Sequence, residues 1–315
     1  MNWSRDSIPN QEGRIFFVTG ANSGLGFDTA QALLAKGATV ILGCRSLEKA
    51  ERARTQLLKI TDFGNIEVIE IDLANLEKIN HVTEQIESKY KKLDVIINNA
   101  GVMAPPQAFS RQGFELQFAV NHLSHMALTL KLLPLLAQQL GGRVVTVSSG
   151  VQYMGKINWN DLQGRKNYDR WASYSQSKLA NVMFALELSQ RLSDAKIAVT
   201  SLSAHPGLAR TNLQATSVKA NASWQEAMAY KLMDPMFQSS QMGSLPQLRA
   251  ATDLNAKNGQ QYGPRFNFRG YPKLCRIAPL ALNSQYRKRL WEISDELIEK
   301  YIDISSAKEI LVEKK

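Results

Sequence analysis

The sequence predicts an α/β fold: a single Rossmann-like, doubly wound parallel sheet with helices on both faces. Short apolar runs alternate with segments of helical periodicity along the first two thirds of the chain. The runs are apolar throughout, as expected for strands that are covered on both faces of a sheet. The links between the elements are short, which favours parallel strands joined by right-handed helical crossovers.

The individual elements follow from these patterns. The expected strands cover residues 14–20, 39–42, 66–72, 94–98, 143–149, 197–204 and 260–266. The expected helices cover residues 25–36, 47–60, 76–90, 114–140, 174–192, 243–254 and 286–301. Gly37 directly follows the first helix, where glycine commonly ends a helix. The alternation weakens after residue 205, and residues 208–241 form a long, partly helical excursion.

Composition limits the class of protein. The chain has 315 residues and a formal net charge of +10, which permits anionic partners without naming one. Cys44 and Cys275 are far apart, so neither a disulfide framework nor a zinc site is indicated. His122 and His125 lie one helical turn apart without a third ligand, so we expect structural roles and no metal.

The two ends of the sequence are polar. Residues 1–13 form a short polar extension without the apolar region of a secretory signal. No stretch of about 18 apolar residues occurs, so no membrane-spanning helix is expected. We therefore expect a cytoplasmic protein, soluble or peripheral to a membrane. Residues 303–315 are charged and are predicted to be a mobile tail.

A glycine-rich turn joins the first strand to the first helix. Residues 19–26 read TGANSGLG, and glycines allow the backbone to approach a pyrophosphate while the helix N-terminus offers free N–H groups. Its place at the first strand-to-helix turn of a parallel sheet gives the motif its weight. The residues expected to contact a dinucleotide here are Gly20, Asn22, Ser23, Gly24, Leu25 and Gly26.

The end of the second strand indicates which dinucleotide is used. An NAD-binding protein usually has a carboxylate here for the ribose hydroxyls, but no acid occurs in residues 38–47. Arg45 instead presents a guanidinium suited to a 2′-phosphate, which favours NADP(H). Asp72, at the end of the third strand, is expected to bond the adenine edge, with Leu73 beside it.

Tyr174 and Lys178 are spaced i, i+4 and share one face of a helix. A free tyrosine has a pKa near 10, and a nearby ammonium favours the phenolate and lowers that pKa. Tyr174 is therefore predicted to exchange a proton with an alcohol or carbonyl oxygen. Ser149 closes the fifth strand at the carboxyl edge of the sheet, where its hydroxyl can hold the carbonyl oxygen.

With these motifs the sequence resembles the short-chain dehydrogenases/reductases from about residue 13 to 262. The matching segments are TGANSGLG, Asp72-Leu73, NNAG at 98–101, Asn121 in VNHLSH, VSS, YSQSK and HPG at 205–207. The resemblance implies that Tyr174 is the acid/base, that Lys178 binds the nicotinamide ribose, that Ser149 orients the carbonyl and that Asn121 supports a water-linked proton relay. It also implies cofactor contacts from Asn98, Asn99, Ala100, Gly101, Pro206, Gly207 and Thr211. On this basis residues 14–302 form a single NADP-binding catalytic domain.

A finer resemblance is to the retinol dehydrogenase (retinal reductase) branch, near the WW-domain oxidoreductase and the protochlorophyllide reductases. The segments GANSGLG, VILGCRS and YSQSKLAN carry it, together with an insert around residues 157–162. The implied substrate is an apolar aldehyde or ketone, interconverted with its alcohol by hydride transfer. In this family residues 208–241 would cover the substrate. An adaptable apolar pocket and ordinary core packing are equally good interpretations of the methionines and aromatics there: Trp224, Met228, Met233, Met236, Phe237 and Met242.

Other interpretations stay open. The protein could reduce a ring C=C bond of a tetrapyrrole or steroid, or be a non-catalytic NADP-binding regulatory protein. Residues 257–289 contain eight basic residues and no acid, with aromatics interleaved. We favour a solvent-exposed basic surface for this stretch. Peripheral contact with an anionic membrane is the second interpretation, and binding of nucleic acid is the least favoured. Family habit suggests a homo-oligomer.

Overall fold

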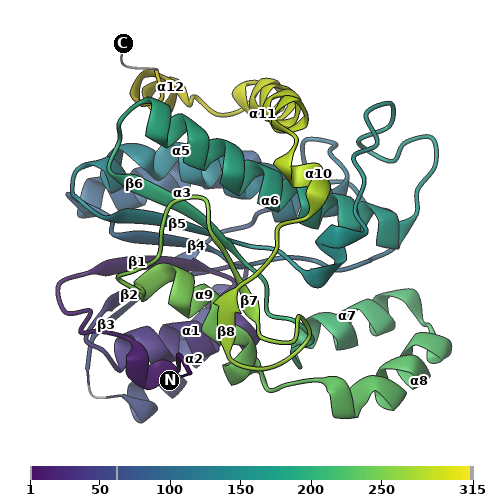
Figure 1. Cartoon of the computed structure of the whole chain (residues 1–315), viewed down its shortest axis with the longest axis horizontal. Helices are drawn as coiled ribbons and strands as arrows, with labels where there is room; N and C mark the ends of the chain where they lie inside the picture. The colour runs from purple at the N-terminus through teal and green to yellow at the C-terminus, as the bar shows by residue number, and fades with distance from the viewer. Residues whose placement is uncertain (1, 62, 313–315) are drawn as a thin grey trace.

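The computed structural model describes residues 2–61 and 63–312 and contains one eight-stranded sheet (Figure 1). The strand order is β3-β2-β1-β4-β5-β6-β7-β8, and every pairing is parallel except that of β7 with β8. The bounds are β1 Ile15–Thr19, β2 Thr39–Cys44, β3 Asn65–Glu70, β4 Val95–Asn98, β5 Gly142–Val147, β6 Val199–Ala204, β7 Gln261–Pro264 and β8 Pro272–Leu274. The predicted fold class is confirmed.

Helices cover both faces of this sheet (Figure 1). One core unites one sheet face with α3 (Leu76–Lys89), α5 (Ser124–Ala137), α6 (Arg170–Asp194) and α11 (Ser284–Glu299). The other unites the opposite face with α1 (Gly24–Leu34), α2 (Leu47–Ile60) and α9 (Ser240–Thr252). Phe16 and Val18 lie in the second core and Phe17 in the first, so β1 is apolar on both sides.

The strand order reverses direction at β1, which pairs with β2 on one side and β4 on the other. In open parallel sheets, ligands bind in the crevice outside the carboxyl ends of the strands at such a switch point. The ends of β1 and β4 are therefore the place where this fold positions a site.

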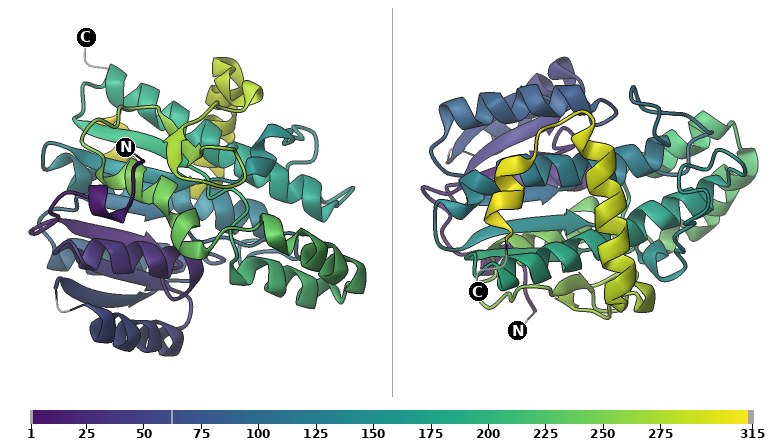
Figure 2. Two further views of the ribbon diagram at one scale, coloured as in Figure 1. Left: turned by 60° about the horizontal axis from the view of Figure 1, so that its bottom comes forward. Right: turned by 90° about the horizontal axis from the view of Figure 1, so that it is seen from above.

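The segment after β6 forms two helices that extend away from the body of the molecule. They are α7 (Asn212–Asn221) and α8 (Trp224–Met233), followed by a 3₁₀ turn at Asp234–Met236. Figure 2 shows the pair projecting beyond the carboxyl ends of the strands in both further views. The remaining helices are α4 (Leu116–Phe118), α10 (Pro279–Leu282) and α12 (Ser305–Ile310).

Two expectations need correction. The helix expected over 114–140 is interrupted by a π-helical turn at Ala119–Leu123. The tail is not mobile from residue 303, because Ile304 and Ala307 are buried in the first core and α12 packs on α5. The polar N-terminal extension packs on α1, since Arg5 contacts Asp28 and Gln31 there and Ile8 is buried.

Candidate active site

The turn between β1 and α1 forms a cradle of backbone. Gly20 and Gly24 have φ values of +66° and +54°, a region that favours glycine. A Cβ on Gly26 would lie 2.4 Å from the carbonyl oxygen of Gly20, so the helix can begin this close to the strand only with glycine there. The Ser23 side chain makes no capping hydrogen bond to the first turn of α1. The helix N-terminus therefore keeps N–H groups that can bind an anion.

Hydrogen bonds join the carboxyl ends of β1 and β4 next to this glycine-rich turn. The hydroxyl of Thr19 accepts hydrogen bonds from the backbone N–H groups of Asn99 (2.9 Å) and Ala100 (3.0 Å). The Asn99 side chain donates in return to the carbonyl oxygen of Thr19, at 2.8 Å. The NNAG segment therefore fixes the shape of the phosphate loop.

A cavity of about 350 Å³ opens over these strand ends. Most of the residues predicted to contact a cofactor line it: Gly20, Asn22, Ser23, Gly24, Leu25, Gly26, Arg45, Asp72, Leu73, Asn99, Ala100, Gly101 and Thr211. The sequence interpretation missed Gly43, Ile71, Met103 and Pro105, which also line it. These residues lie at strand ends and in loops, and none has a polar side chain that would suggest cofactor binding from the sequence.

Arg45 and Asp72 are the charged residues of this lining. Arg45 follows β2 and is exposed, so its guanidinium can reach a ligand in the cavity. Asp72 accepts a hydrogen bond from the backbone N–H of Ala74 at 3.0 Å, which orients its carboxylate. The uncapped helix, the glycine cradle and one cation at the β2 end fit a dinucleotide with an additional phosphate.

A second group of side chains lies where β5 meets α6. Tyr174 and Lys178 are 5% and 4% exposed, and the Lys178 ammonium lies 5.9 Å from the centre of the Tyr174 ring. The Ser149 side chain lies close enough to Tyr174 to lower the pKa of its phenol. The ammonium of Lys178 donates to the carbonyl oxygen of Val147 at 3.3 Å. The half-buried Ser149 at the end of β5 therefore lies beside two buried residues of α6.

The pKa values of this pair differ from the sequence expectation. Burial raises the pKa of Tyr174 to about 12, an effect that Tyr230 strengthens and the Ser149 hydrogen bond opposes. Burial also lowers the pKa of Lys178 to about 8. The pKa of Tyr174 therefore lies above its ordinary value, contrary to the sequence prediction, and Lys178 is not among the causes of its shift. Desolvation disfavours the charged form of both groups.

Asn121 lies in the π-helical turn, a feature often found at functional sites. Its side chain accepts from the backbone N–H of Val102 at 2.8 Å and donates to Ser177 at 2.9 Å. A Cβ on Gly101 would lie 3.0 Å from Asn121 Oδ1 and 3.4 Å from Lys178 Nζ. Asn121 therefore borders the space between the NNAG segment and Lys178.

His125 is a site residue whose role the sequence did not reveal. Its Nδ1 lies 3.1 Å from the carbonyl oxygen of Asn121, and its Nε2 lies 2.9 Å from the Thr19 hydroxyl. Burial lowers the pKa of His125 to about 4, so the ring is neutral at pH 7. Because a carbonyl only accepts, Nδ1 carries the proton and Nε2 accepts from Thr19. His122, one turn earlier, bonds Ser294 instead.

Comparison with known proteins places this arrangement in a family. The family model described as "short chain dehydrogenase" matches residues 14–222. This chain belongs to the short-chain dehydrogenase family. It is 35% identical to retinol dehydrogenase 12 of Mus musculus over 288 residues, covering 91% of this chain and 86% of that protein. Retinol dehydrogenase 14 of Homo sapiens is 35% identical over 302 residues, with the same coverage. The predicted family and its retinol dehydrogenase branch are confirmed.

Solved structures share this fold. An uncharacterised protein from Mycobacterium paratuberculosis has a TM-score of 0.79 and 36% identity, covering 95% of this chain and 98% of that one. A short-chain dehydrogenase from Shigella flexneri, complexed with NADP, shares the fold with a TM-score of 0.62 and 24% identity, covering 81% and 98%. The protein is thus an oxidoreductase of the short-chain dehydrogenase family.

The HPG turn of this short-chain dehydrogenase is shaped by a neighbouring hairpin. Gly207 has a φ of +65°, and a Cβ there would lie 2.4 Å from the carbonyl oxygen of Phe268. Pro206 and Gly207 do not line the 350 Å³ cavity, although Thr211 does. Their predicted contact with a cofactor stays a prediction. His205 is buried, and neither of its ring nitrogens has a hydrogen-bond partner among the described residues.

A second cavity of about 300 Å³ lies on the other side of α7. Its lining is Arg210, Thr211, Gln214, Ala215, Val218, Tyr230, Asp234 and Phe237. Of the methionines and aromatics expected near the substrate, Phe237 alone lines either of these two cavities. Trp224, Met228, Met233 and Met236 are 68%, 54%, 37% and 44% exposed. These four line neither cavity, and Trp224 and Met228 lie on the outward face of α8, whereas Glu226 and Tyr230 lie on its inner face.

The pKa of Lys178 leads to a prediction about stability. Its pKa is about 8 in the folded protein and 10.5 in the ordinary state, so the folded state disfavours the charged form. Below pH 8, Lys178 is charged in both the folded and the unfolded state, so the folded protein is destabilised by the full cost of burying the charge. This destabilisation decreases between pH 8 and 10.5 and is absent above pH 10.5, where Lys178 is neutral in both states. Lys178→Met should therefore raise the free energy of unfolding at pH 7 by about 1–3 kcal/mol, and the gain should shrink between pH 8 and 10.5.

Urea unfolding across this pH range measures the effect, and Lys156→Met, at an exposed lysine, is the matched control. A gain that is absent at pH 7, or that is equal for the control, would contradict the assigned burial of the Lys178 charge.

Proposed function

We propose that this short-chain dehydrogenase is an NADP(H)-dependent enzyme that interconverts an apolar aldehyde or ketone with its alcohol. The observation that supports the proposal most strongly is the group formed by Tyr174, Lys178 and the half-buried Ser149, because Lys178 lies next to Gly101 of the cavity over the glycine cradle. When bound, the nicotinamide supplies or accepts the hydride at the carbonyl carbon. The protein's own residues must then position the carbonyl oxygen and move one proton.

Tyr174 is the proposed proton donor to the carbonyl oxygen, because its high pKa keeps the phenol protonated at neutral pH. Ser149 lies close enough to Tyr174 to affect its ionisation, so an oxygen accepting from both hydroxyls would be held between them. Loss of the proton leaves a phenolate, which the adjacent Lys178 stabilises when it is protonated. In the alcohol-oxidising direction the same groups act in reverse.

Asn121 and Lys178 are proposed to pass protons between this cluster and solvent. Both side chains border Gly101, and both form hydrogen bonds with backbone groups that fix their positions. Hydrogen bonding of the Asn121 carbonyl to His125 adds a further constraint on the π-helical turn. The proposed roles of these residues follow the family resemblance, and the contacts support them.

The substrate is proposed to be long and apolar, retinal-like in shape. The retinol dehydrogenase relatives support this class. The second cavity adds Ala215, Val218, Tyr230 and Phe237 as an apolar wall next to Thr211 of the cofactor cavity. Reduction of a ring C=C bond would use the same proton donor and is the alternative reaction.

Peripheral contact with an anionic membrane is also a proposal. In the described part of the sequence no helix is long and apolar enough to cross a bilayer. Part of the basic stretch 257–289 makes contacts within the protein, because Arg287 pairs with Glu187 and Arg289 stacks on Trp159. Exposed aromatics at Phe266, Phe268 and Tyr271 accompany the basic residues of the β7–β8 hairpin. The proposed lipid-facing surface therefore narrows to residues 265–273.

The cofactor preference is testable at Arg45. NADPH should bind more tightly than NADH by about 1.5–3 kcal/mol, the free energy of a charge-assisted hydrogen bond. Arg45→Asp should reverse this preference in a fluorescence titration of both cofactors. Lys49→Asp, the same change of charge at an exposed position of α2 that does not line the cavity, should leave it largely unchanged. Equal affinities for the two cofactors in the unaltered protein would refute the proposal.

The proton donor is testable at Tyr174. Tyr174→Phe should lower turnover of retinal by about 100-fold or more, because only the transferable proton is lost. NADPH affinity should stay within about twofold, since the aromatic ring is retained. Tyr271→Phe, at a tyrosine that is 40% exposed, is the control and should retain full activity. If Tyr174→Phe keeps more than about a tenth of the rate, the proton donor is another group.

A further inference from the structure

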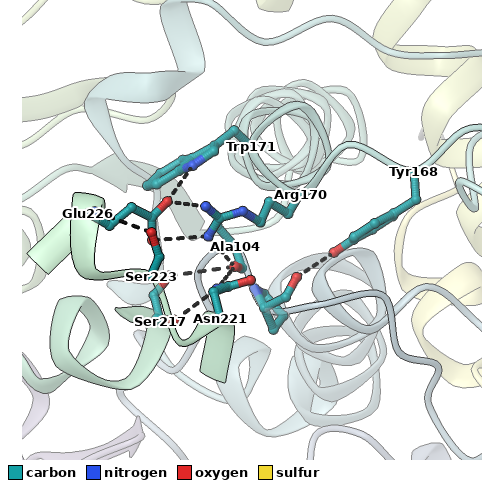
Figure 3. Close-up of polar contacts among 9 residues, drawn as sticks. Ala104, Tyr168, Arg170, Trp171, Ser217, Asn221, Ser223 and Glu226 are labelled. Carbon is teal, nitrogen blue, oxygen red and sulfur yellow. Dashed lines mark hydrogen bonds and ion pairs between the residues drawn. The ribbon is translucent and has the colours of Figure 1, made fainter. Parts of the chain in front are cut away.

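Glu226 connects the projecting helix α8 to the start of the helix that carries Tyr174 and Lys178. Its carboxylate accepts from both terminal nitrogens of the Arg170 guanidinium, one of them at 3.1 Å, and from the indole N–H of Trp171 at 3.3 Å (Figure 3). The Glu226 and Arg170 side chains are 17% and 25% exposed. This is a bidentate, partly buried ion pair, and bidentate pairs of arginine with a carboxylate are among the strong charge-assisted contacts.

The residues that Glu226 holds contact the proposed proton donor. Arg170 and Trp171 are the first two residues of α6. The Trp171 ring packs edge-on against Tyr174, with ring centres 6.1 Å apart and planes at 76°. Tyr230, one helical turn after Glu226, is close enough to Tyr174 to affect its ionisation. The inner face of α8 therefore lies over Tyr174.

The same network reaches the loop that lines the cofactor cavity. The carbonyl oxygen of Ala104 accepts from Arg170 (3.4 Å), Asn221 (2.9 Å) and Ser217 (3.5 Å). Figure 3 shows these donors converging on it from α6 and α7. Ala104 itself has a φ of +45°, an uncommon conformation for a residue with a side chain. The neighbouring residues Met103 and Pro105 line the 350 Å³ cavity.

The other end of α8 is held differently. Asp234 also forms a bidentate pair with Arg210, at 2.8 and 2.9 Å, but the two side chains are 57% and 56% exposed. An ion pair in this setting is screened by solvent and contributes little. The attachment of α8 to the body at its two ends is thus unequal, and the partly buried pair at Glu226 is the stronger one.

We propose that Glu226 is a positioning residue for the reaction, whose ion pair with Arg170 holds α8 closed over the substrate space above Tyr174. Release of the pair lets α8 move away and admits the substrate. This inference rests on the proposed function for its kinetic effect. Its structural effect, the attachment of α8, can be measured without any turnover.

The test compares Glu226→Gln with Asp234→Asn in the full-length protein with NADPH bound. Both changes remove one negative charge from an ion pair of α8 and keep the side-chain shape. Trypsin reports on attachment, because Lys219 and Lys231 are exposed on α7 and α8 and become better substrates when the helices detach. Glu226→Gln should accelerate cleavage at these sites at least about fivefold, since a charge-assisted contact is lost.

The kinetic readout separates positioning from general damage. Glu226→Gln should raise KM for retinal at least about fivefold and change kcat less than about twofold, because closure is weakened while Tyr174, Lys178 and Ser149 stay in place. Asp234→Asn should change the cleavage rate, KM and kcat by less than about twofold each. NADPH affinity and melting temperature should match the parent in both variants, which shows that each one folds.

A double-mutant cycle identifies the partner. Arg170→Met should have effects at least as large as Glu226→Gln, because it removes the same ion pair and also the contact with Ala104. The double variant should be no worse than Arg170→Met alone, since the ion pair is already lost there. Unchanged cleavage in Glu226→Gln, or equal acceleration in Asp234→Asn, would overturn the proposal. Absence of turnover in the parent protein would contradict the proposed function instead, and the cleavage rates would still decide the role of Glu226.

Discussion

The hydroxyl group of Thr19 is the interaction on which the rest of the site depends. It is fully buried at the end of β1, accepts from two consecutive backbone N–H groups that follow β4, and donates to His125. One side chain thereby joins the phosphate loop to the NNAG segment and, through His125, to the carbonyl of Asn121. A parallel sheet brings these strand ends together, but the hydroxyl determines their spacing.

Burial controls the chemistry at the other end of the site. Tyr174 and Lys178 are both withdrawn from water, and each is driven toward its neutral form, with pKa values of about 12 and about 8. In such surroundings a proton moves only when a charge is stabilised at the same moment, which Ser149 and Lys178 are placed to do. Exclusion of water by α8 and by Trp171 would keep these interactions strong.

The sequence predicts most of the strand and helix order, because apolar runs and glycine turns are local signals. It anticipates the phosphate loop and the Tyr174–Lys178 face for the same reason. It misses β8, a three-residue edge strand that begins with Pro272 and pairs only with β7. It also reverses the effect on the Tyr174 pKa, because charge spacing is visible in a sequence and desolvation is not.

Contacts between distant segments account for the remaining differences. The Glu226–Arg170 pair joins positions 56 residues apart, and nothing in either local pattern indicates it. The methionines of α8 are compatible with a substrate pocket by composition alone. In the structure Glu226 and Tyr230 face the body of the molecule, so Met228 lies on the opposite, outward side of α8. Likewise the charged tail contains Ile304 and Ala307, which are buried. Their burial holds the start of the tail against the core although its composition is mostly polar.

The central claim is that this protein delivers a hydride to an apolar carbonyl carbon under the control of Tyr174. In the most direct test, the protein is incubated with retinal and with NADPH that carries deuterium at the transferable C4 position. The alcohol product is then analysed by mass spectrometry. We expect retinol with one deuterium on the carbon that bore the carbonyl oxygen. Bound NADPH without any deuterated alcohol, or deuterium placed on an olefinic carbon of the ring or the polyene, would contradict it.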